Sequence, residues 1–248
     1  MKNRIIKITL ISYISLFVIQ GLFFLCLFLF LLDKPEIRVW GILSSIVSYI
    51  FVIFFYIKIE KIDLNFKYLL PSKRIILYII FLSILFVLAY PFLTIINFAS
   101  NLFDNVVNLT TINNTNLFSE TSSIFYFISI VFITPILEEI YFRGIILSQL
   151  NKIYNVFWSI LISSLLFSIY HMDYEQSQIS LFFGLLSGYL YAKTNNLFIS
   201  VLLHSLINFF IFFTMNHSVN LLDHSFLLLF IPLIIILMVV FTKKIIKK

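Results

Sequence analysis

Charged residues are scarce in this chain, and their scarcity excludes a soluble globular domain. Only 11% of the 248 residues are Asp, Glu, Lys or Arg, and 61% are hydrophobic, whereas soluble domains carry about 25% charged residues. Cysteine is nearly absent as well. Cys26 is the single one, so no disulfide can form within the chain. No stretch separates a soluble module, and the sequence contains no internal repeat. The composition therefore predicts an all-α polytopic membrane protein, with residues 1–248 forming a single integral membrane domain.

The apolar runs give the number of membrane spans. A hydrocarbon core of ~30 Å needs ~20 apolar residues to cross it as a helix. We predict eight spans: Ile8–Leu32, Trp40–Ile57, Ile75–Phe98, Ser123–Leu147, Val156–Tyr170, Ile179–Ala192, Leu197–Thr214 and Ser225–Phe241. The fifth and sixth are short, so they should tilt little or lie within the bundle. The 31 phenylalanines are expected to face lipid.

Lysine and arginine are distributed unequally between the two ends of the predicted spans. With the N-terminus in the cytoplasm, fourteen of them lie inside and only Lys34 and Arg38 lie outside, which leaves Arg143 in the membrane. Cytoplasmic loops are the ones that carry such an excess. We therefore predict a multi-pass protein of the cell membrane, with both termini cytoplasmic. The net charge of +6 is assigned to contacts with anionic lipid headgroups rather than to nucleic acid, because the basic residues are scattered over short loops.

Two adjacent glutamates, Glu138 and Glu139, interrupt the fourth apolar span. A charged side chain in the middle of a bilayer costs roughly 2.5–3.5 kcal/mol on insertion scales, so two of them need a reason. Arg143 follows Glu139 at i+4, where the two can form an ion pair on one face of the helix. Glu138 points in another direction and is left as the candidate for chemistry.

Three further polar residues fall at membrane depth. His171 ends the run Phe167-Ser168-Ile169-Tyr170, and His204 and Asn208 are four residues apart, so they share one face of their helix. Two imidazoles, a carboxylate and an amide can form a site that activates water. Imidazole and carboxylate ligands suit Zn²⁺, with His171 and His204 as the expected ligands, and zinc lowers the pKa of a bound water to ~7. A glutamate can also act as the general base itself.

Three motifs in this order resemble a known family. Glu138-Glu139-x-x-x-Arg143, Phe167-x-x-x-His171 and His204-x-x-x-Asn208 are similar to the motifs of the CAAX-protease and bacteriocin-processing family of intramembrane proteases, also called the abortive-infection family or type II CAAX prenyl endopeptidases. The resemblance covers about residues 133–210, and the expected catalytic core is about residues 123–214.

The resemblance implies roles for these residues. Glu138 and His171 would activate the attacking water, while His204 and Asn208 would bind a metal or stabilise the oxyanion. Glu139 and Arg143 would be a supporting ion pair. Other intramembrane proteases are excluded, since the chain has no H-E-x-x-H pair, no Gly-x-Ser-Gly and no pair of aspartates within a span. Gly184-x-x-x-Gly188 is interpreted as a helix-packing face rather than a site.

The predicted function is that of an intramembrane endopeptidase that uses water activated by glutamate and histidine, with or without zinc, on a membrane-associated peptide or protein. If the host is a bacterium, a peptide pheromone, a bacteriocin precursor or a membrane protein is a more plausible substrate than a prenylated protein. Two alternatives stay open. A bacteriocin-immunity protein could bind a peptide in the same cavity without cleaving it, and a proton-coupled transporter could use Glu138 and the histidines as a relay.

Overall fold

The computed structural model describes residues 2–30, 37–60, 71–87 and 120–216, and all of the regular structure in these ranges is helical. The order along the chain is α1 (Lys2–Phe30), α2 (Ile37–Glu60), a helix over residues 73–87, α4 (Glu120–Ile128), η1 (Ser129–Ile133), α5 (Thr134–Glu139), η2 (Ile140–Leu147), α6 (Ser148–Leu150), α7 (Val156–Tyr170), α8 (Tyr174–Thr194) and α9 (Leu197–Asn216). The predicted all-α class holds for these residues.

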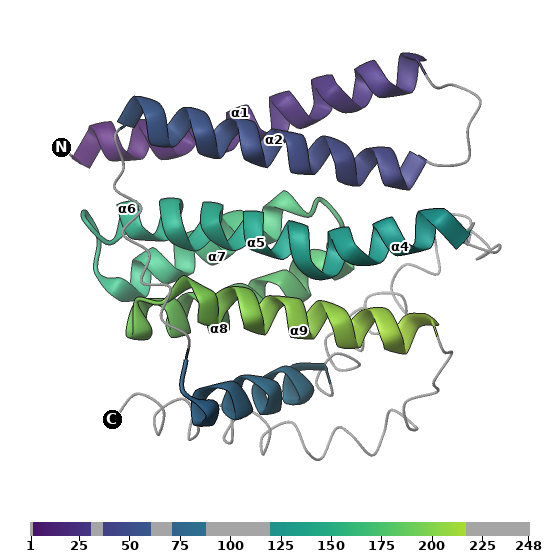
Figure 1. Ribbon diagram of the computed structural model, residues 1–248. Helices are drawn as coiled ribbons and strands as arrows, with labels where there is room; N and C mark the ends of the chain where they lie inside the picture. The colour runs from purple at the N-terminus through teal and green to yellow at the C-terminus, as the bar shows by residue number, and fades with distance from the viewer. Residues whose placement is uncertain (1, 31–36, 61–70, 88–119, 217–248) are drawn as a thin grey trace, which may run out of the picture.

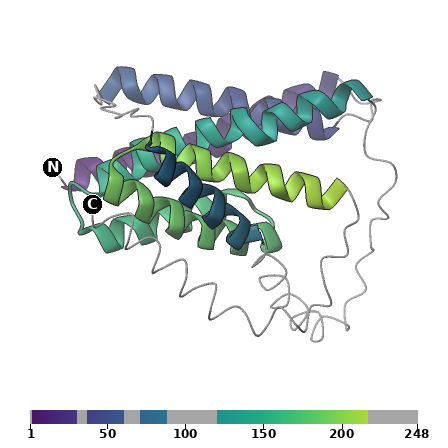
Figure 2. The same ribbon diagram turned by 60° about the horizontal axis from the view of Figure 1, so that its bottom comes forward.

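The helices lie roughly side by side in a bundle (Figure 1). α1 packs on α2, α7 packs on α8, and α9 contacts both α8 and α5. The helix over residues 73–87 packs against α8, where the rings of Phe86 and Phe183 meet edge to face at 6.1 Å; Figure 2 shows it lying across the green helices. The long helix that carries the two glutamates is therefore enclosed by neighbours from both halves of the described chain.

Short polar segments end one helix and begin the next. The side chain of Asn155 accepts a hydrogen bond from the Trp158 N–H (3.0 Å) and starts α7, and Asp173 Oδ1 accepts from the Gln176 N–H (2.8 Å) and starts α8. Asn195 ends α8 in the left-handed conformation at φ 47°. These are ordinary helix caps, which satisfy the backbone groups left free at helix ends.

Fewer helices qualify as membrane spans than the eight predicted. Within the described ranges, three are long and apolar enough to cross a membrane: Lys2–Cys26, Trp40–Lys58 and Ile124–Leu150. Val156–Tyr170 and Leu197–Phe212 are apolar but shorter. At 15 residues, α7 reaches only ~22 Å of the ~30 Å core. The eighth predicted span, Ser225–Phe241, lies outside the described residues, and the third, Ile75–Phe98, is described only as far as residue 87.

The surface of the bundle is rich in exposed apolar side chains, as the surface of a membrane protein should be. Leu22 is 62% exposed, Phe54 64% and Phe157 67%, on three different helices. An aqueous surface rarely tolerates such continuous apolar area, whereas lipid does not penalise it. Together with the apolar spans, this surface assigns the chain to a membrane.

Candidate functional site

The two glutamates sit in one continuous helix that runs from α4 to α6 and contains two π-wound stretches. η1 and η2 are wound as π-helix, and α5, with Glu138 and Glu139 at its end, lies between them. Stretches of π-helix are rare, and they occur often at functional sites. Both carboxylates are buried. The sequence places them in an apolar span, and the altered winding on either side sets the direction in which each one points.

Glu139 is contacted by one cation and two hydrogen-bonding groups, which lie on three helices. Its Oε2 lies 3.2 Å from Arg143 Nε and 2.8 Å from the Ser187 hydroxyl. Its Oε1 lies 3.2 Å from His204 Nδ1. The side chain has no solvent exposure, so these donors replace the water that a carboxylate would otherwise bind. The i+4 ion pair is therefore present, and Glu139 also connects α8 and α9 to its own helix.

Arg143 is 1% exposed and is enclosed by aromatic rings. Its guanidinium carbon lies 4.7 Å from the centroid of Phe167 and 5.5 Å from that of Phe183. None of its three guanidinium nitrogens makes a hydrogen bond with a described residue, although Nε is within ion-pair distance of Glu139. The charge of Glu139 and the cation–π contacts are therefore the main stabilisation of the guanidinium. The expectation that the phenylalanines face lipid is wrong for Phe142, Phe167 and Phe183, which are buried around this site.

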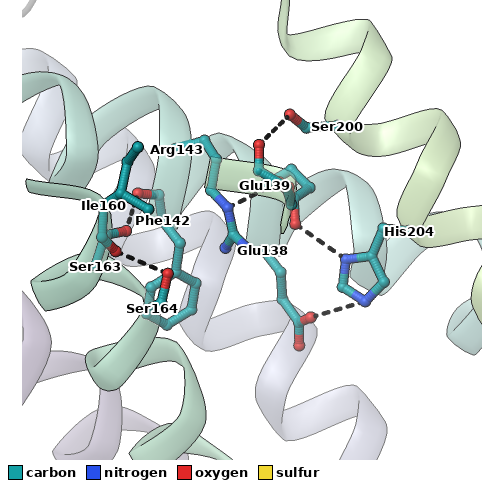
Figure 3. Close-up of polar contacts among 10 residues, drawn as sticks. Glu138, Glu139, Phe142, Arg143, Ile160, Ser163, Ser164, Ser200 and His204 are labelled. Atoms are coloured by element: carbon teal, nitrogen blue, oxygen red, sulfur yellow. Dashed lines mark hydrogen bonds and ion pairs between the residues drawn. The ribbon is translucent and has the colours of Figure 1, made fainter. Parts of the chain in front are cut away.

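Glu138 points away from Arg143 and toward His204, as Figure 3 shows. Its Oε2 lies 3.7 Å from His204 Nε2. Glu138 also interacts electrostatically with the phenols of Tyr49 on α2 and Tyr170 at the end of α7. Unlike Glu139, it makes no hydrogen bond or ion pair shorter than this 3.7 Å contact within the described part of the chain.

His204 bridges the two carboxylates through its two ring nitrogens (Figure 3). Because a carboxylate oxygen accepts hydrogen bonds, the contact with Glu139 assigns the proton of the ring to Nδ1. Nε2 is then the nitrogen that faces Glu138. The phenyl ring of Phe183 lies 4.3 Å from the imidazole, centroid to centroid, and restricts its rotation. The sequence predicts His204 as a site residue, but not that it contacts both glutamates.

His171 lies at the C-terminal end of α7 and is half-buried. Its Nδ1 is 2.9 Å from the Phe167 carbonyl, which can only accept, so Nδ1 carries the proton and Nε2 the lone pair. The ring centroids of His171 and His204 lie 4.8 Å and 5.9 Å from that of Phe167, so both imidazoles pack against the same phenyl ring. Within the described residues, no hydrogen bond or ion pair joins His171 to Glu138.

Asn208 contacts the helix of the glutamates at a different point. Its amide Nδ2 donates to the backbone carbonyl of Ile130 at 3.0 Å. Ile130 belongs to η1, in the turn before Pro135 and the two glutamates. The face that Asn208 shares with His204 is thus turned toward this helix, but the amide binds backbone rather than a carboxylate.

A zinc site needs three or four protein ligands at about 2.0–2.3 Å. No group of three His, Cys, Asp or Glu side chains is close enough to hold a metal ion in the part of the chain that the structure describes. The residues as arranged do not form a zinc site by themselves. The zinc predicted from the sequence stays a prediction, and no chemical step below depends on it.

Sequence reasoning missed Ser187, Tyr49 and Tyr170 as site residues. Ser187 stands between Gly184 and Gly188, and a Cβ added at these glycines would lie 3.0 Å from Ser164 Cβ and 3.2 Å from Ile160 Cγ2 respectively. The glycines are thus a packing face against α7, as predicted. Because Ser187 lies within this packing face, the sequence could have predicted that its hydroxyl is buried between helices.

Comparison with known proteins agrees with the motifs. The family described as "Rce1-like: Type II CAAX prenyl endopeptidase Rce1-like" matches residues 120–210. A protein of Bacillus subtilis (strain 168) named "Putative membrane peptidase YdiL" is 38% identical over 77 residues, which are 31% of this chain and 32% of that protein. The chain thus matches about a third of this relative's length. No solved structure matches the chain significantly. The resemblance predicted from the three motifs is confirmed: residues 120–210 match the Rce1-like family of type II CAAX prenyl endopeptidases.

Proposed function

We propose that this protein is an intramembrane endopeptidase, in which Glu138 activates a water molecule to hydrolyse a peptide bond of a membrane-associated protein or peptide. One observation carries the proposal: the buried imidazole of His204 is held by one carboxylate at Nδ1 and presents Nε2 to a second, less constrained carboxylate, Glu138. A proton-accepting pair oriented by a third group is the arrangement that hydrolases use to activate a nucleophile.

The division of labour between the glutamates follows from their contacts. Glu139 is held by Arg143 and Ser187 and fixes the tautomer and orientation of His204. Among the described residues Glu138 has no such partners, and its carboxylate stays available for a proton. One glutamate is therefore structural and orienting, and the other is the base.

The distance between Glu138 Oε2 and His204 Nε2 suits a bridging water. At 3.7 Å the two atoms are too far apart for a direct hydrogen bond. Both are acceptors when the histidine is neutral and the glutamate ionised, so one water can donate to each of them. In the proposed reaction Glu138 takes one proton of this water, its oxygen attacks the scissile carbonyl carbon, and Glu138 then delivers the proton to the leaving nitrogen as the C–N bond breaks.

His171 is the second group that we assign to the reaction. Its Nδ1 is fixed on the Phe167 carbonyl, which leaves the Nε2 lone pair free for the water or for a substrate N–H. The imidazole of His171 packs against the Phe167 ring, as the imidazole of His204 does. We therefore keep His171 in the catalytic set predicted from the motifs, as a partner of the substrate or of the water rather than of Glu138.

The position of the chain in the membrane supports the same assignment. The first residues of α1, the last of α2, the turn after α6 and the α8–α9 junction lie at one end of the bundle (Figure 1), and Lys2 Nζ lies 5.0 Å from the ring of Tyr154 in that turn. Lys58, Lys152 and Lys193 are at this end as well. We propose that it faces the cytoplasm of a bacterial cell. We propose a peptide precursor or a membrane protein as the substrate, and the name of the Bacillus subtilis relative supports the peptidase activity.

The experiment compares the termini of membrane and secreted peptides from cells that make the wild-type protein or Glu138→Gln at equal levels. A peptidase should produce new peptide termini that are absent from the variant. An immunity protein that acts by binding should give identical termini and protect equally well in both forms. A transporter should instead show pH-driven flux in liposomes that Glu138→Gln abolishes. Identical termini together with either of these results would overturn the proposal.

A further inference from the structure

The turn before the glutamates has a backbone carbonyl without a backbone donor. In the π-winding of η1 each N–H bonds to the carbonyl five residues earlier, and the N–H of Thr134 does so with the carbonyl of Ser129. The next bond in this series would run from residue 135 to the carbonyl of Ile130. Residue 135 is proline, which has no N–H. The Ile130 carbonyl is thus left for a partner from outside its own helix.

The amide of Asn208 is that partner. Its Nδ2 lies 3.0 Å from the Ile130 carbonyl, although the two residues are 78 positions apart in the sequence. The lipid of a membrane cannot donate a hydrogen bond to a free carbonyl, so such a donor matters more there than in a soluble protein. The second π-wound stretch has a similar contact, because the Ser163 hydroxyl of α7 donates to the Phe142 carbonyl of η2 at 2.9 Å (Figure 3).

The contact at Ile130 also sets the register of the catalytic groups. α9 carries His204 one turn before Asn208, and the two side chains reach the same helix at the glutamates and at Ile130. The residue numbers run in opposite directions along the two helices, so the helices are antiparallel. A shift of α9 that kept one contact would break the other. Two fixed points are what a helix needs in order to hold the His204 ring between Glu138 and Glu139.

We propose that Asn208 is a positioning residue: its amide replaces the N–H that Pro135 lacks, and it thereby fixes α9 so that His204 faces both glutamates. One N–H of the Asn208 amide is thereby engaged by the helix backbone. The catalytic part of this inference rests on the proposed function, whereas the contact with Ile130 can be tested by stability alone.

The test restores the missing backbone donor. Asn208→Ala should lower the melting temperature of the full-length protein in detergent by about 2–4 °C. It should also lower kcat toward a peptide substrate roughly 100-fold, as a displacement of ~1 Å at reacting groups does. Adding Pro135→Ala supplies an N–H for the Ile130 carbonyl, so the double variant should regain both the melting temperature and most of the activity. Pro135→Ala alone should stay close to wild type.

Asn155→Ala is the matched control. It removes the N-cap of α7 and should also lower the melting temperature, but Pro135→Ala should not restore it. Recovery of neither property in the Asn208→Ala, Pro135→Ala double variant would overturn the proposal. Recovery of melting alone, with cleavage still lost, would overturn it too, because the amide would then act on the substrate. If the wild-type protein cleaves no peptide, the proposed function fails, and loss and recovery of melting still decide whether the amide supports the Ile130 carbonyl.

Discussion

Substitutions of Glu139 and Arg143, which form a buried ion pair, should have non-additive effects on stability. Combining the two should restore part of the stability but not the peptide cleavage. Arg143→Met removes the cation and leaves Glu139 with only the Ser187 and His204 donors. Glu139→Gln leaves a guanidinium with 1% exposure among aromatic rings and without its 3.2 Å partner. Breaking a buried pair from either side typically costs ~3–5 kcal/mol. At about 2–4 °C per kcal/mol for a chain of this size, each single variant should melt roughly 6–20 °C below wild type.

The double variant, Glu139→Gln with Arg143→Met, should be more stable than the sum of the single effects predicts. It buries no unpaired charge, and the coupling should be at the upper end of the ~0.5–3 kcal/mol seen between residues in contact. Peptide cleavage should not recover, because His204 has lost the carboxylate that orients it. Circular dichroism melts in detergent and kcat on the same samples test this, with Lys152→Met as a control that should stay within about 0.5 kcal/mol of wild type. Strictly additive losses, or a double variant that regains activity, would refute the reasoning.

Three further predictions concern packing, a hydroxyl and the metal. Gly184→Ala brings a Cβ within 3.1 Å of the α7 backbone and should destabilise the protein by about 1–2 kcal/mol. The control Gly21→Ala, whose Cβ has nothing within 4 Å, should be neutral or stabilising by up to ~1 kcal/mol. Equal shifts of the melting temperature in the two variants would contradict this. Ser187→Ala should cost about 1 kcal/mol and lower kcat, while Ser45→Ala, whose hydroxyl donates only to its own helix, should change neither. If zinc participates, elemental analysis should find near-stoichiometric metal that His171→Ala removes, and a metal-free protein that still cleaves peptide would exclude that role.

The sequence contains enough information to predict the elements of the site but not how they meet. Helical periodicity shows that Arg143 follows Glu139 on one face and that His204 and Asn208 share another. It does not give the register between two helices, which depends on how their side chains pack. The joint role of Glu138 and His171 was expected from the family resemblance alone, while the structure brings Glu138 toward His204 and leaves His171 on the Phe167 carbonyl.

The winding of the helix around the glutamates could not be predicted either. Pro135 suggests a disturbed helix, but a proline is compatible with a kink, a helix start or a π-turn. Which of these forms depends on donors from other helices, such as the Asn208 amide at Ile130. The same limit applies to Ser187, because a serine in an apolar helix can bond to its own backbone, and only the packing of α8 brings it to Glu139.

The most direct test of Glu138 as the base is to measure both the melting temperature and kcat of Glu138→Gln in the purified, reconstituted protein. The substitution keeps the shape and the hydrogen-bonding capacity of the side chain and removes its ability to take a proton. In the part of the chain that the structure describes, Glu138 has no arginine partner of the kind that Glu139 has, so the melting temperature should stay near that of wild type. The value of kcat should fall by at least about 100-fold, the contribution of a general base. A variant that cleaves at the wild-type rate, or one that melts as early as Glu139→Gln, would contradict the assignment of Glu138 as the group that activates water.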